Sequence, residues 1–195
     1  LSNQKTSDVT VTRGALDTSA FYEIRKQGNV SFGYIELSTF GTDTAKQVEI
    51  ALEMFKKKNI QTLVIDLRDN GGGYLTAATD ILDLFFTSDE VIYQMKEKNS
   101  AAKKYYAESD KKYEFENGYI LVNENTASAA EVLIGALKDN LGDTVTTVGT
   151  TSYGKGTEQV TVPFSDGTSF KYTVARWYTP KGTSINKKGF KPDVE

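Results

Sequence analysis

The sequence predicts an α/β fold in which a largely parallel sheet is flanked by helices and followed by a C-terminal β-hairpin. Three observations support this prediction. A strand–helix–strand–helix order runs through residues 31–86, and such an order builds a parallel sheet. Residues 62–67 are almost continuously apolar, as in strands that are covered on both faces. Residues 160–174 alternate apolar and polar side chains around Ser165-Asp166-Gly167, which indicates a hairpin.

The N-terminal half of the chain provides the first strands and helices of this sheet. Residues 31–37 are aromatic and β-branched, which predicts a buried strand. Residues 43–58 carry apolar side chains at helical spacing, and the pair Thr44-x-x-Gln47 predicts a capping box at their start. The apolar strand at 62–67 leads into a glycine turn, after which a second helix is expected over residues 75–86.

The C-terminal half begins with a polar stretch. Residues 96–117 are expected to form a solvated excursion that is partly helical and carries no chemistry. Residues 118–123 then predict another buried strand, and residues 128–140, apolar on most faces, a buried helix. A short strand over 145–148 and a flexible loop over 149–156 lead into the hairpin. No strong linker is visible, which favours one compact domain.

Composition excludes several kinds of chemistry. The 195 residues include no His and no Cys, which removes histidine bases, thiol nucleophiles, disulfides and the usual zinc sites. The formal net charge of −3 argues against general affinity for nucleic acid, which needs clustered positive charge. No stretch approaches the roughly 20 apolar residues of a membrane span. Acid–base chemistry must therefore come from Lys, Asp, Glu, Tyr or the backbone.

The first candidate site is Asp69-Asn70-Gly71-Gly72-Gly73, at the carboxyl end of the apolar strand. Ligands of open α/β sheets bind at that end of the strands. Glycines also expose the backbone N–H groups that an anion site or an oxyanion hole requires. Taken alone, the segment is better explained as a tight turn that needs positive φ.

The second candidate is Ser128, which lies where a strand ends and a buried helix begins. A serine at this position is commonly an N-cap. Two features favour a functional hydroxyl instead. Ala127 and Ala129 leave space above the hydroxyl, and the N–H of Ala129 would point toward a negative charge forming on an attacked carbonyl.

The third candidate is Lys155, between two glycines in a loop. Most such lysines are simply solvated, and the order of residues does not fit a phosphate-binding loop. With no His available, however, a neutral lysine is the remaining base for Ser128, because burial disfavours the ammonium form. Gln159, four residues later, could fix the direction of the amine.

Two further residues receive structural interpretations. Asp66 lies inside the apolar strand and is expected to pair with Arg68 or another basic group rather than to act in acid–base chemistry. Trp177 is expected to pack in the core or at its rim.

Six segments together closely resemble the carboxy-terminal processing proteases, or tail-specific proteases, of the S41 family. They are GYIELSTF (33–40), DLRDNGGG (66–73), VNENTASAAE (122–131), SYGKGTEQ (152–159), DGTSFKYTVARWYTPKG (166–182) and GFKPDV (189–194). The resemblance extends over residues 31–194, and the motifs are far more specific jointly than singly. It implies a crotonase/ClpP-like α/β core that needs no cofactor.

The resemblance also implies the roles of the candidate residues. Ser128 matches the nucleophile of the family, Lys155 the general base and Gln159 the glutamine that orients the base. The oxyanion hole is placed on the backbone of Gly72, with Gly71 as the alternative, and on that of Ala129.

At the level of the whole chain, the resemblance implies a serine endopeptidase that cleaves protein substrates near their C-termini. Residues 31–195 are expected to be the catalytic core and residues 1–30 an entry segment, in which residues 8–13 would be the tail of a missing PDZ domain. The substrate would bind as an extended strand along a sheet edge. No nucleic acid partner is expected, and the oligomeric state stays open. The full-length protein is expected to be exported from a bacterium, and the fragment itself to be soluble.

Two other functions use the same fold. A non-catalytic binding module would hold an apolar ligand or a peptide in the cleft, and a crotonase-type enzyme would bind an acyl-CoA. The joint presence of Ser128, Lys155 and Gln159 favours the protease, because a binding module has no need of all three.

Overall fold

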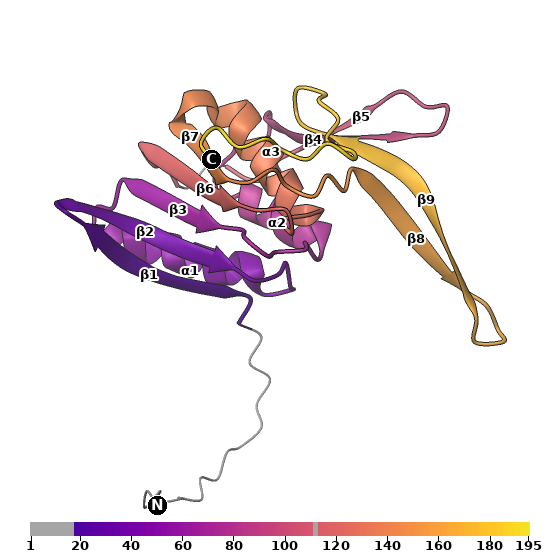
Figure 1. Ribbon diagram of the computed structural model, residues 1–195, viewed down its shortest axis with the longest axis horizontal. Coiled ribbons are helices and arrows are strands. Elements are labelled where there is room, and N and C mark those ends of the chain that lie inside the picture. Colours follow the sequence, from indigo (N-terminus) through magenta and orange to yellow (C-terminus); the bar gives the residue numbers. More distant parts are fainter. Residues whose placement is uncertain (1–17, 111–112) are drawn as a thin grey trace, which may run out of the picture.

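Two β-sheets and three α-helices make up the computed structural model, which describes residues 18–110 and 113–195 (Figure 1). The first sheet has the order β1 (Ala20–Gln27), β2 (Val30–Leu37), β3 (Thr62–Asp66), β6 (Asn117–Val122) and β7 (Val145–Gly149). The second has the order β5 (Lys103–Tyr106), β4 (Val91–Glu97), β9 (Ser169–Tyr178) and β8 (Thr157–Pro163). The helices are α1 (Thr44–Lys57), α2 (Leu75–Leu82) and α3 (Ala129–Leu141), the last followed by the 3₁₀ turn η1 (Gly142–Thr144).

The first sheet is largely parallel, as the sequence predicts. Strands β2, β3, β6 and β7 pair in parallel, whereas β1 runs antiparallel to β2 along its full length from Ala20 to Gln27. The boundary expected between the entry segment (residues 1–30) and the catalytic core (residues 31–195) therefore falls within the β1–β2 pair. Residues 20–27 belong to the same sheet as the strands of the core. The expected PDZ tail at residues 8–13 lies outside the described residues.

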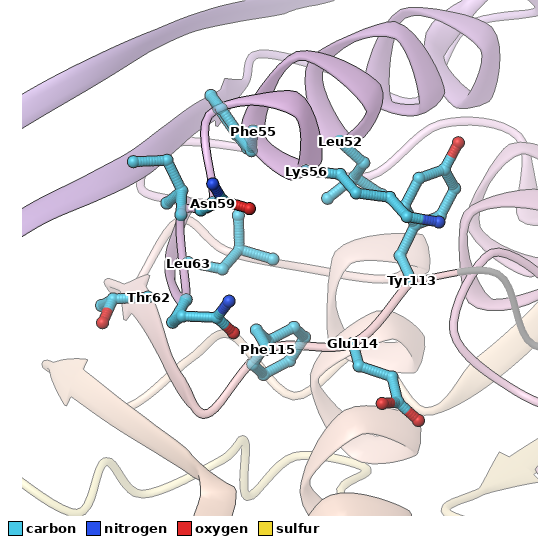
Figure 2. A pocket seen from close by; sticks show the side chains of 11 residues that line it. Leu52, Phe55, Lys56, Asn59, Thr62, Leu63, Tyr113, Glu114 and Phe115 are labelled. Carbon is cyan, nitrogen blue, oxygen red and sulfur yellow. The ribbon is translucent and has the colours of Figure 1, made fainter.

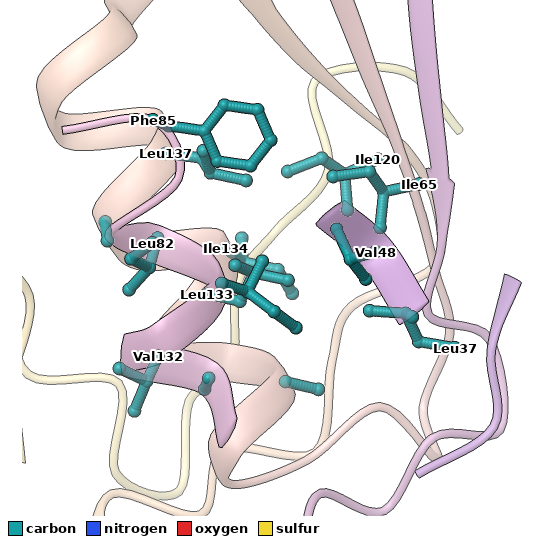
Figure 3. Packing of buried hydrophobic residues seen from close by; sticks show 14 of the residues in the cluster. Leu37, Val48, Ile65, Leu82, Phe85, Ile120, Val132, Leu133, Ile134 and Leu137 are labelled. Carbon is teal, nitrogen blue, oxygen red and sulfur yellow. The ribbon is translucent and has the colours of Figure 1, made fainter. Parts of the chain in front are cut away.

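The hydrophobic core lies between this sheet and its helices (Figure 3). Leu63 and Ile65 of β3 are buried and belong to the cluster that contains apolar residues of all three helices. The alternate residue of β3, Val64, and Leu121 of β6 are only half-buried. The expectation that residues 62–67 are covered on both faces is therefore met only in part, because the helices pack on one face. Among the described residues, no helix is long and apolar enough to cross a membrane.

The starts and ends of the helices differ in part from the sequence prediction. Helix α1 spans nearly the predicted residues, but its N-cap Asp43 makes no side-chain capping bond. Gln47 Oε1 instead accepts a hydrogen bond from the N–H of Ala20 at 2.9 Å, which ties α1 to β1. The predicted capping box is wrong because this turn of the helix faces β1. Helix α2 ends at Leu82, and the buried residues 84–86 follow it as turns.

The second sheet corrects the prediction for residues 96–117. Where a partly helical excursion is expected, β4 and β5 form an antiparallel hairpin. Asn99 has a φ of 65°, a conformation that suits a tight turn, and Tyr93 stacks on Tyr105 with ring centroids 4.5 Å apart. The predicted C-terminal hairpin is present as β8 and β9. It extends away from the body of the molecule (Figure 1), and β9 also pairs with β4.

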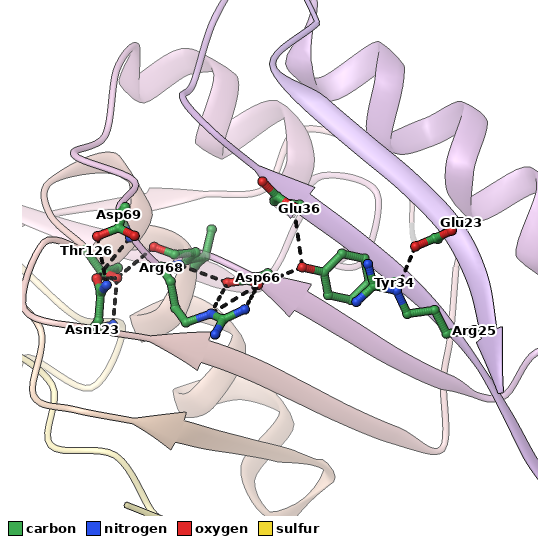
Figure 4. Close-up of polar contacts among 10 residues, drawn as sticks. Glu23, Arg25, Tyr34, Glu36, Asp66, Arg68, Asp69, Asn123 and Thr126 are labelled. Carbon is green, nitrogen blue, oxygen red and sulfur yellow. Dashed lines mark hydrogen bonds and ion pairs between the residues drawn. The ribbon is translucent and has the colours of Figure 1, made fainter. Parts of the chain in front are cut away.

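A polar network lies on the face of the first sheet that the helices leave uncovered (Figure 4). Arg68 Nε donates to Asp66 Oδ1 at 2.9 Å, which confirms the expected ion pair, and Tyr34 OH donates to Asp66 Oδ2 at 2.7 Å. Burial alone would raise the pKa of Asp66, but the hydrogen bonds from Arg68 and Tyr34 lower it below its usual value. Burial, together with the bond to Asp66, raises the pKa of Tyr34 to about 12. Asp66 therefore joins β2 to β3 as a buried carboxylate.

Candidate active site

Ser128 lies at the N-cap of α3, just beyond the carboxyl end of β6. The segment between them is fixed by the buried Thr126, whose Oγ1 donates to the carbonyl of Leu67 at 2.7 Å. Ser128 itself has φ 61° and ψ −119°, a strained conformation for a residue with a side chain. Strained turns between a strand and a helix are known to present nucleophilic serines. The predicted nucleophile is thus half-buried at the start of a buried helix.

The glycine turn packs directly against Ser128. Gly72 has a φ of 99°, and a methyl group placed on its Cα would lie 2.8 Å from Ser128 Cβ and 3.1 Å from the nitrogen of Ala129. Such distances are too short for carbon, so only glycine fits here. A methyl group on Gly71 would meet open space. The fold therefore brings Gly72 next to Ser128 and Ala129, although Gly72 lies 56 positions before Ser128 in the sequence.

The two predicted oxyanion donors differ in their surroundings. Ala129 is the first residue of α3, so its N–H has no acceptor within the helix. The N–H of Gly72 donates to Asn70 Oδ1 at 2.8 Å, and Asn70 is fully buried. Asn70 in turn donates from Nδ2 to the carbonyl of Leu37 at 2.7 Å. Asn70, which belongs to the first candidate segment but was given no role of its own, thus fixes the glycine turn to the end of β2.

Lys155 and Gln159 reach the same cavity as Ser128. The cavity has a volume of about 230 Å³. Its polar lining includes Ser128, Lys155 and Gln159, and its apolar lining includes Leu75, Tyr93, Met95, Ala129, Val132 and Trp177. Ser128 follows β6 of the first sheet along the chain, and Lys155 precedes β8 of the second. The cavity that both residues line therefore lies where the two sheets meet.

Gln159 lies on the exposed part of the cavity. Its Nε2 donates to Thr173 Oγ1 at 3.5 Å, across the β8–β9 pair. The register of that pair shifts between Glu158 and Gln159, so that both of these successive residues line the cavity. Such irregularities redirect side chains next to active sites.

Two residues that the sequence analysis gave no catalytic role hold the loop that carries Lys155. The carboxylate of Glu131 accepts the N–H of Lys155 at 2.8 Å and the N–H of Ser128 at 2.9 Å. Trp177 Nε1 donates to the carbonyl of Lys155 at 2.8 Å. The position of Glu131 three residues after Ser128 fits a capping box, so the spacing Ser-x-x-Glu was the signal that could have identified it. No comparable signal exists for Trp177.

A larger hollow of about 330 Å³ lies elsewhere (Figure 2). It is formed by the end of α1, the start of β3 and the segment that contains Tyr113 and Phe115. None of the predicted catalytic residues lines it. Because Thr62 begins β3 whereas Ser128 follows the end of β6, the hollow lies at the opposite end of the parallel sheet from the candidate site.

Comparisons with known proteins converge on one family. The sequence model of peptidase family S41 matches residues 31–195. The carboxy-terminal processing protease CtpB of Bacillus subtilis is 41% identical over 179 residues, and CtpA of the same organism is 35% identical over 188 residues. Among solved structures, the photosystem II D1 C-terminal processing protease aligns with a TM-score of 0.80 at 30% identity.

The matches cover almost all of this chain but only part of each relative. The alignments include 92% and 96% of the chain and 36% and 39% of CtpB and CtpA, respectively. The alignment with the D1 processing protease covers 96% of this chain and 49% of that one. The chain thus spans well under half the length of the two Bacillus relatives.

Proposed function

The chain belongs to peptidase family S41, and from this membership we propose that it is the catalytic domain of a serine endopeptidase that cleaves protein substrates near their C-termini. The observation that supports this proposal is one cavity that Ser128, Lys155 and Ala129 all line. Gly72 packs against Ser128 beside that cavity.

The proposed reaction uses a Ser128–Lys155 dyad. Ser128 Oγ attacks the carbonyl carbon of the scissile peptide bond, and its proton passes to the neutral amine of Lys155. The C–N bond then breaks as Lys155 returns that proton to the leaving amine, which leaves an acyl ester on Ser128. Water, deprotonated by the same lysine amine, attacks the ester carbonyl; the C–O bond to Ser128 then breaks, and the lysine returns the proton to Ser128 Oγ as the acid product leaves.

The oxyanion of each tetrahedral intermediate is proposed to bind to backbone N–H groups. The N–H of Ala129 is available at the first turn of α3, where the helix dipole also favours negative charge. The N–H of Gly72 points at Asn70 Oδ1, so its participation requires that it exchange this acceptor for the oxyanion. Ala129 is therefore the primary donor of the proposal, and Gly72 also serves to let the chain approach Ser128 closely.

The substrate is proposed to bind as an extended strand beside β8. Strand β8 is the last in its sheet, so among the described strands none pairs with its outer edge. Thr157, Glu158 and Gln159 at its start line the cavity, so a peptide paired with this edge would pass Lys155 and Ser128. Backbone pairing of this kind accepts many sequences. The apolar lining from Leu75, Met95 and Val132 suits an uncharged substrate side chain.

Two further properties of the full-length protein are proposed here from the family resemblance alone. They are a PDZ domain that captures the substrate C-terminus and export from a bacterial cell. Gln159 is proposed to orient the amine of Lys155, since both line the same cavity.

The proposal is tested by peptide cleavage with two single variants. Ser128→Ala removes the nucleophile and Lys155→Ala removes the base, so each is expected to lower kcat by at least about 1,000-fold while circular dichroism shows a folded chain. Lys104→Ala, which removes an exposed lysine of β5, is the matched control and is expected to keep wild-type turnover. Normal turnover in either site variant would reject the dyad.

A further inference from the structure

We propose that Glu131 is a positioning residue whose single carboxylate sets the geometry between the nucleophile and the base. The inference rests on the proposed function of Ser128 and Lys155 and adds a residue to it. Glu131 lies on the first turn of α3 and is fully buried. A charged residue is rarely fully buried unless its partners compensate it, so its contacts call for an explanation.

Four hydrogen-bond donors converge on this carboxylate. Oε1 accepts from Ser152 Oγ and from the N–H of Gly154, both at 2.7 Å. Oε2 accepts from the N–H of Ser128 at 2.9 Å and from the N–H of Lys155 at 2.8 Å. Each of the two oxygens thus accepts two hydrogen bonds, and a carboxylate can satisfy all four donors because both of its oxygens are acceptors.

The bonds to Oε2 join the two proposed catalytic residues through one atom. The backbone nitrogens of Ser128 and Lys155 are each one hydrogen bond from Oε2, so they lie less than two hydrogen-bond lengths apart. No backbone hydrogen bond within a strand or helix joins the two residues, because Ser128 is the N-cap of α3 and Lys155 precedes β8. Glu131 is thus a direct link between the start of α3 and the loop that precedes β8, at the point where the chemistry is proposed.

The bonds to Oε1 extend this link to the C-terminal segment. Ser152 Oγ, which donates to Glu131, also accepts the N–H of Phe190 at 2.7 Å. Gly154 packs against the backbone of residues 185–189, and its carbonyl accepts the N–H of Lys187 at 2.8 Å. The loop that carries Lys155 is therefore held between Glu131 on one side and the C-terminal segment on the other.

An amide of the same shape cannot replace this carboxylate. Glutamine offers one acceptor oxygen and one NH₂ group, and in either orientation the NH₂ would face two of the four donors. Unsatisfied buried donors destabilise their surroundings. With the NH₂ in place of Oε2, the strained backbone of Ser128 would lose a bond that holds it; with the NH₂ in place of Oε1, the loop that carries Lys155 would lose its bond at Gly154. The result is a folded protein in which Ser128 and Lys155 no longer meet correctly.

The test compares Glu131→Gln with Asp193→Asn, which removes an exposed carboxylate that also accepts several hydrogen bonds. Asp193 Oδ2 accepts bonds from Lys138 and Thr147 near β7, and it does not line the cavity. Both variants are expected to melt at lower temperature than wild type. Glu131→Gln is also expected to lower kcat about 100-fold with KM little changed, as for a small misplacement of reacting groups. It should slow modification of Ser128 by a fluorophosphonate by a similar factor. Asp193→Asn should keep both rates.

The outcomes separate this inference from the proposed function. If wild-type Ser128 is modified and Glu131→Gln is modified equally fast, the positioning role is wrong and the dyad stands. Equal loss of kcat in both variants would also overturn the positioning role, because it would show only general destabilisation. If wild-type Ser128 is not modified at all, both proposals fail. Should Glu131→Gln not fold, Ser152→Ala, which removes one of the four donors, is expected to lower kcat about 10-fold, and unchanged kcat would contradict the inference.

Discussion

Gly72 and Ser128 illustrate how single residues shape the site. Both have positive φ, and the Cα of one faces the Cβ of the other with no room for another atom. A glycine is required at position 72 for two separate reasons, conformation and space. Position 71 has neither constraint in the structure, since its φ is not positive and a side chain there would meet open space.

Gly72→Ala is therefore expected to reduce both stability and activity. The added methyl group would press on Ser128 and Ala129, and the alanine would have to adopt an unfavourable positive φ. Together these two effects are expected to lower the unfolding free energy by about 2–4 kcal/mol. Peptide cleavage should fall by more than about 100-fold, because Ser128 and Ala129 are displaced. Thermal melting and kcat measure the two effects. Gly71→Ala is the matched control, and a loss of activity there equal to that of Gly72→Ala would contradict the assignment.

Asp66 predicts a pH dependence of stability that is separate from catalysis. Its pKa is below the usual 3.8 in the folded protein, because the bonds from Arg68 and Tyr34 outweigh the effect of burial. A lowered folded pKa stabilises the protein at pH values above 3.8, and this stabilisation is lost as the pH falls through the folded value. Asp66→Asn should therefore be less stable than wild type at pH 7, and the difference in unfolding free energy should shrink below about pH 4.

Urea unfolding at several pH values between 7 and 3 provides this measurement. A difference between Asp66→Asn and wild type that stays constant down to pH 3 would show that Asp66 contributes through packing rather than charge. Because Asp66 does not line the cavity, kcat at pH 7 should stay close to the wild-type value.

At the scale of the elements, periodic apolar segments were predictable and polar segments were not. The strands at 62–67 and 118–123 and the helix at 128–140 bury one face or more, and burial leaves a clear pattern in the sequence. Residues 96–117 have no such pattern. Their hairpin depends on the turn at Asn99 and on the stacking of Tyr105 on Tyr93, a contact with a residue outside the segment.

Strand β8 leads to a prediction about substrates. If the peptide pairs with the outer edge of β8, its alternate backbone N–H groups donate to β8 and the others point away. N-methylation of a donating position should raise KM by about 2- to 10-fold per lost bond. Methylation of the intervening position, with the same side chains, is the control and should have little effect. A series in which KM does not alternate with position would argue against strand pairing.

At the scale of the whole molecule, the candidate site depends on how two sheets meet. The parallel sheet brings the carboxyl ends of β3 and β6 together and so places the glycine turn beside Ser128. The second sheet supplies Lys155 and Gln159 at the start of β8. The motifs identified these residues in the sequence, but the cavity between the sheets could be described only from the structure.

Glu131 shows why part of this arrangement was not predictable. Its four donors come from residues 128, 152, 154 and 155, and only the first is near it in the sequence. The spacing Ser-x-x-Glu indicates a capping bond within α3. It carries no information on the loop that contains Lys155, because residues 152, 154 and 155 lie 21 to 24 positions further along the chain. The bond between Trp177 and the carbonyl of Lys155 is hidden in the same way.

The dyad is tested most directly by identifying the residue that a fluorophosphonate modifies and how fast. Mass mapping of the modified protein is expected to place the adduct on Ser128 alone, and Lys155→Ala is expected to slow its formation by at least about 100-fold, because the hydroxyl then lacks its base. An adduct on another residue, or modification of Ser128 at the wild-type rate in Lys155→Ala, would contradict the proposed chemistry.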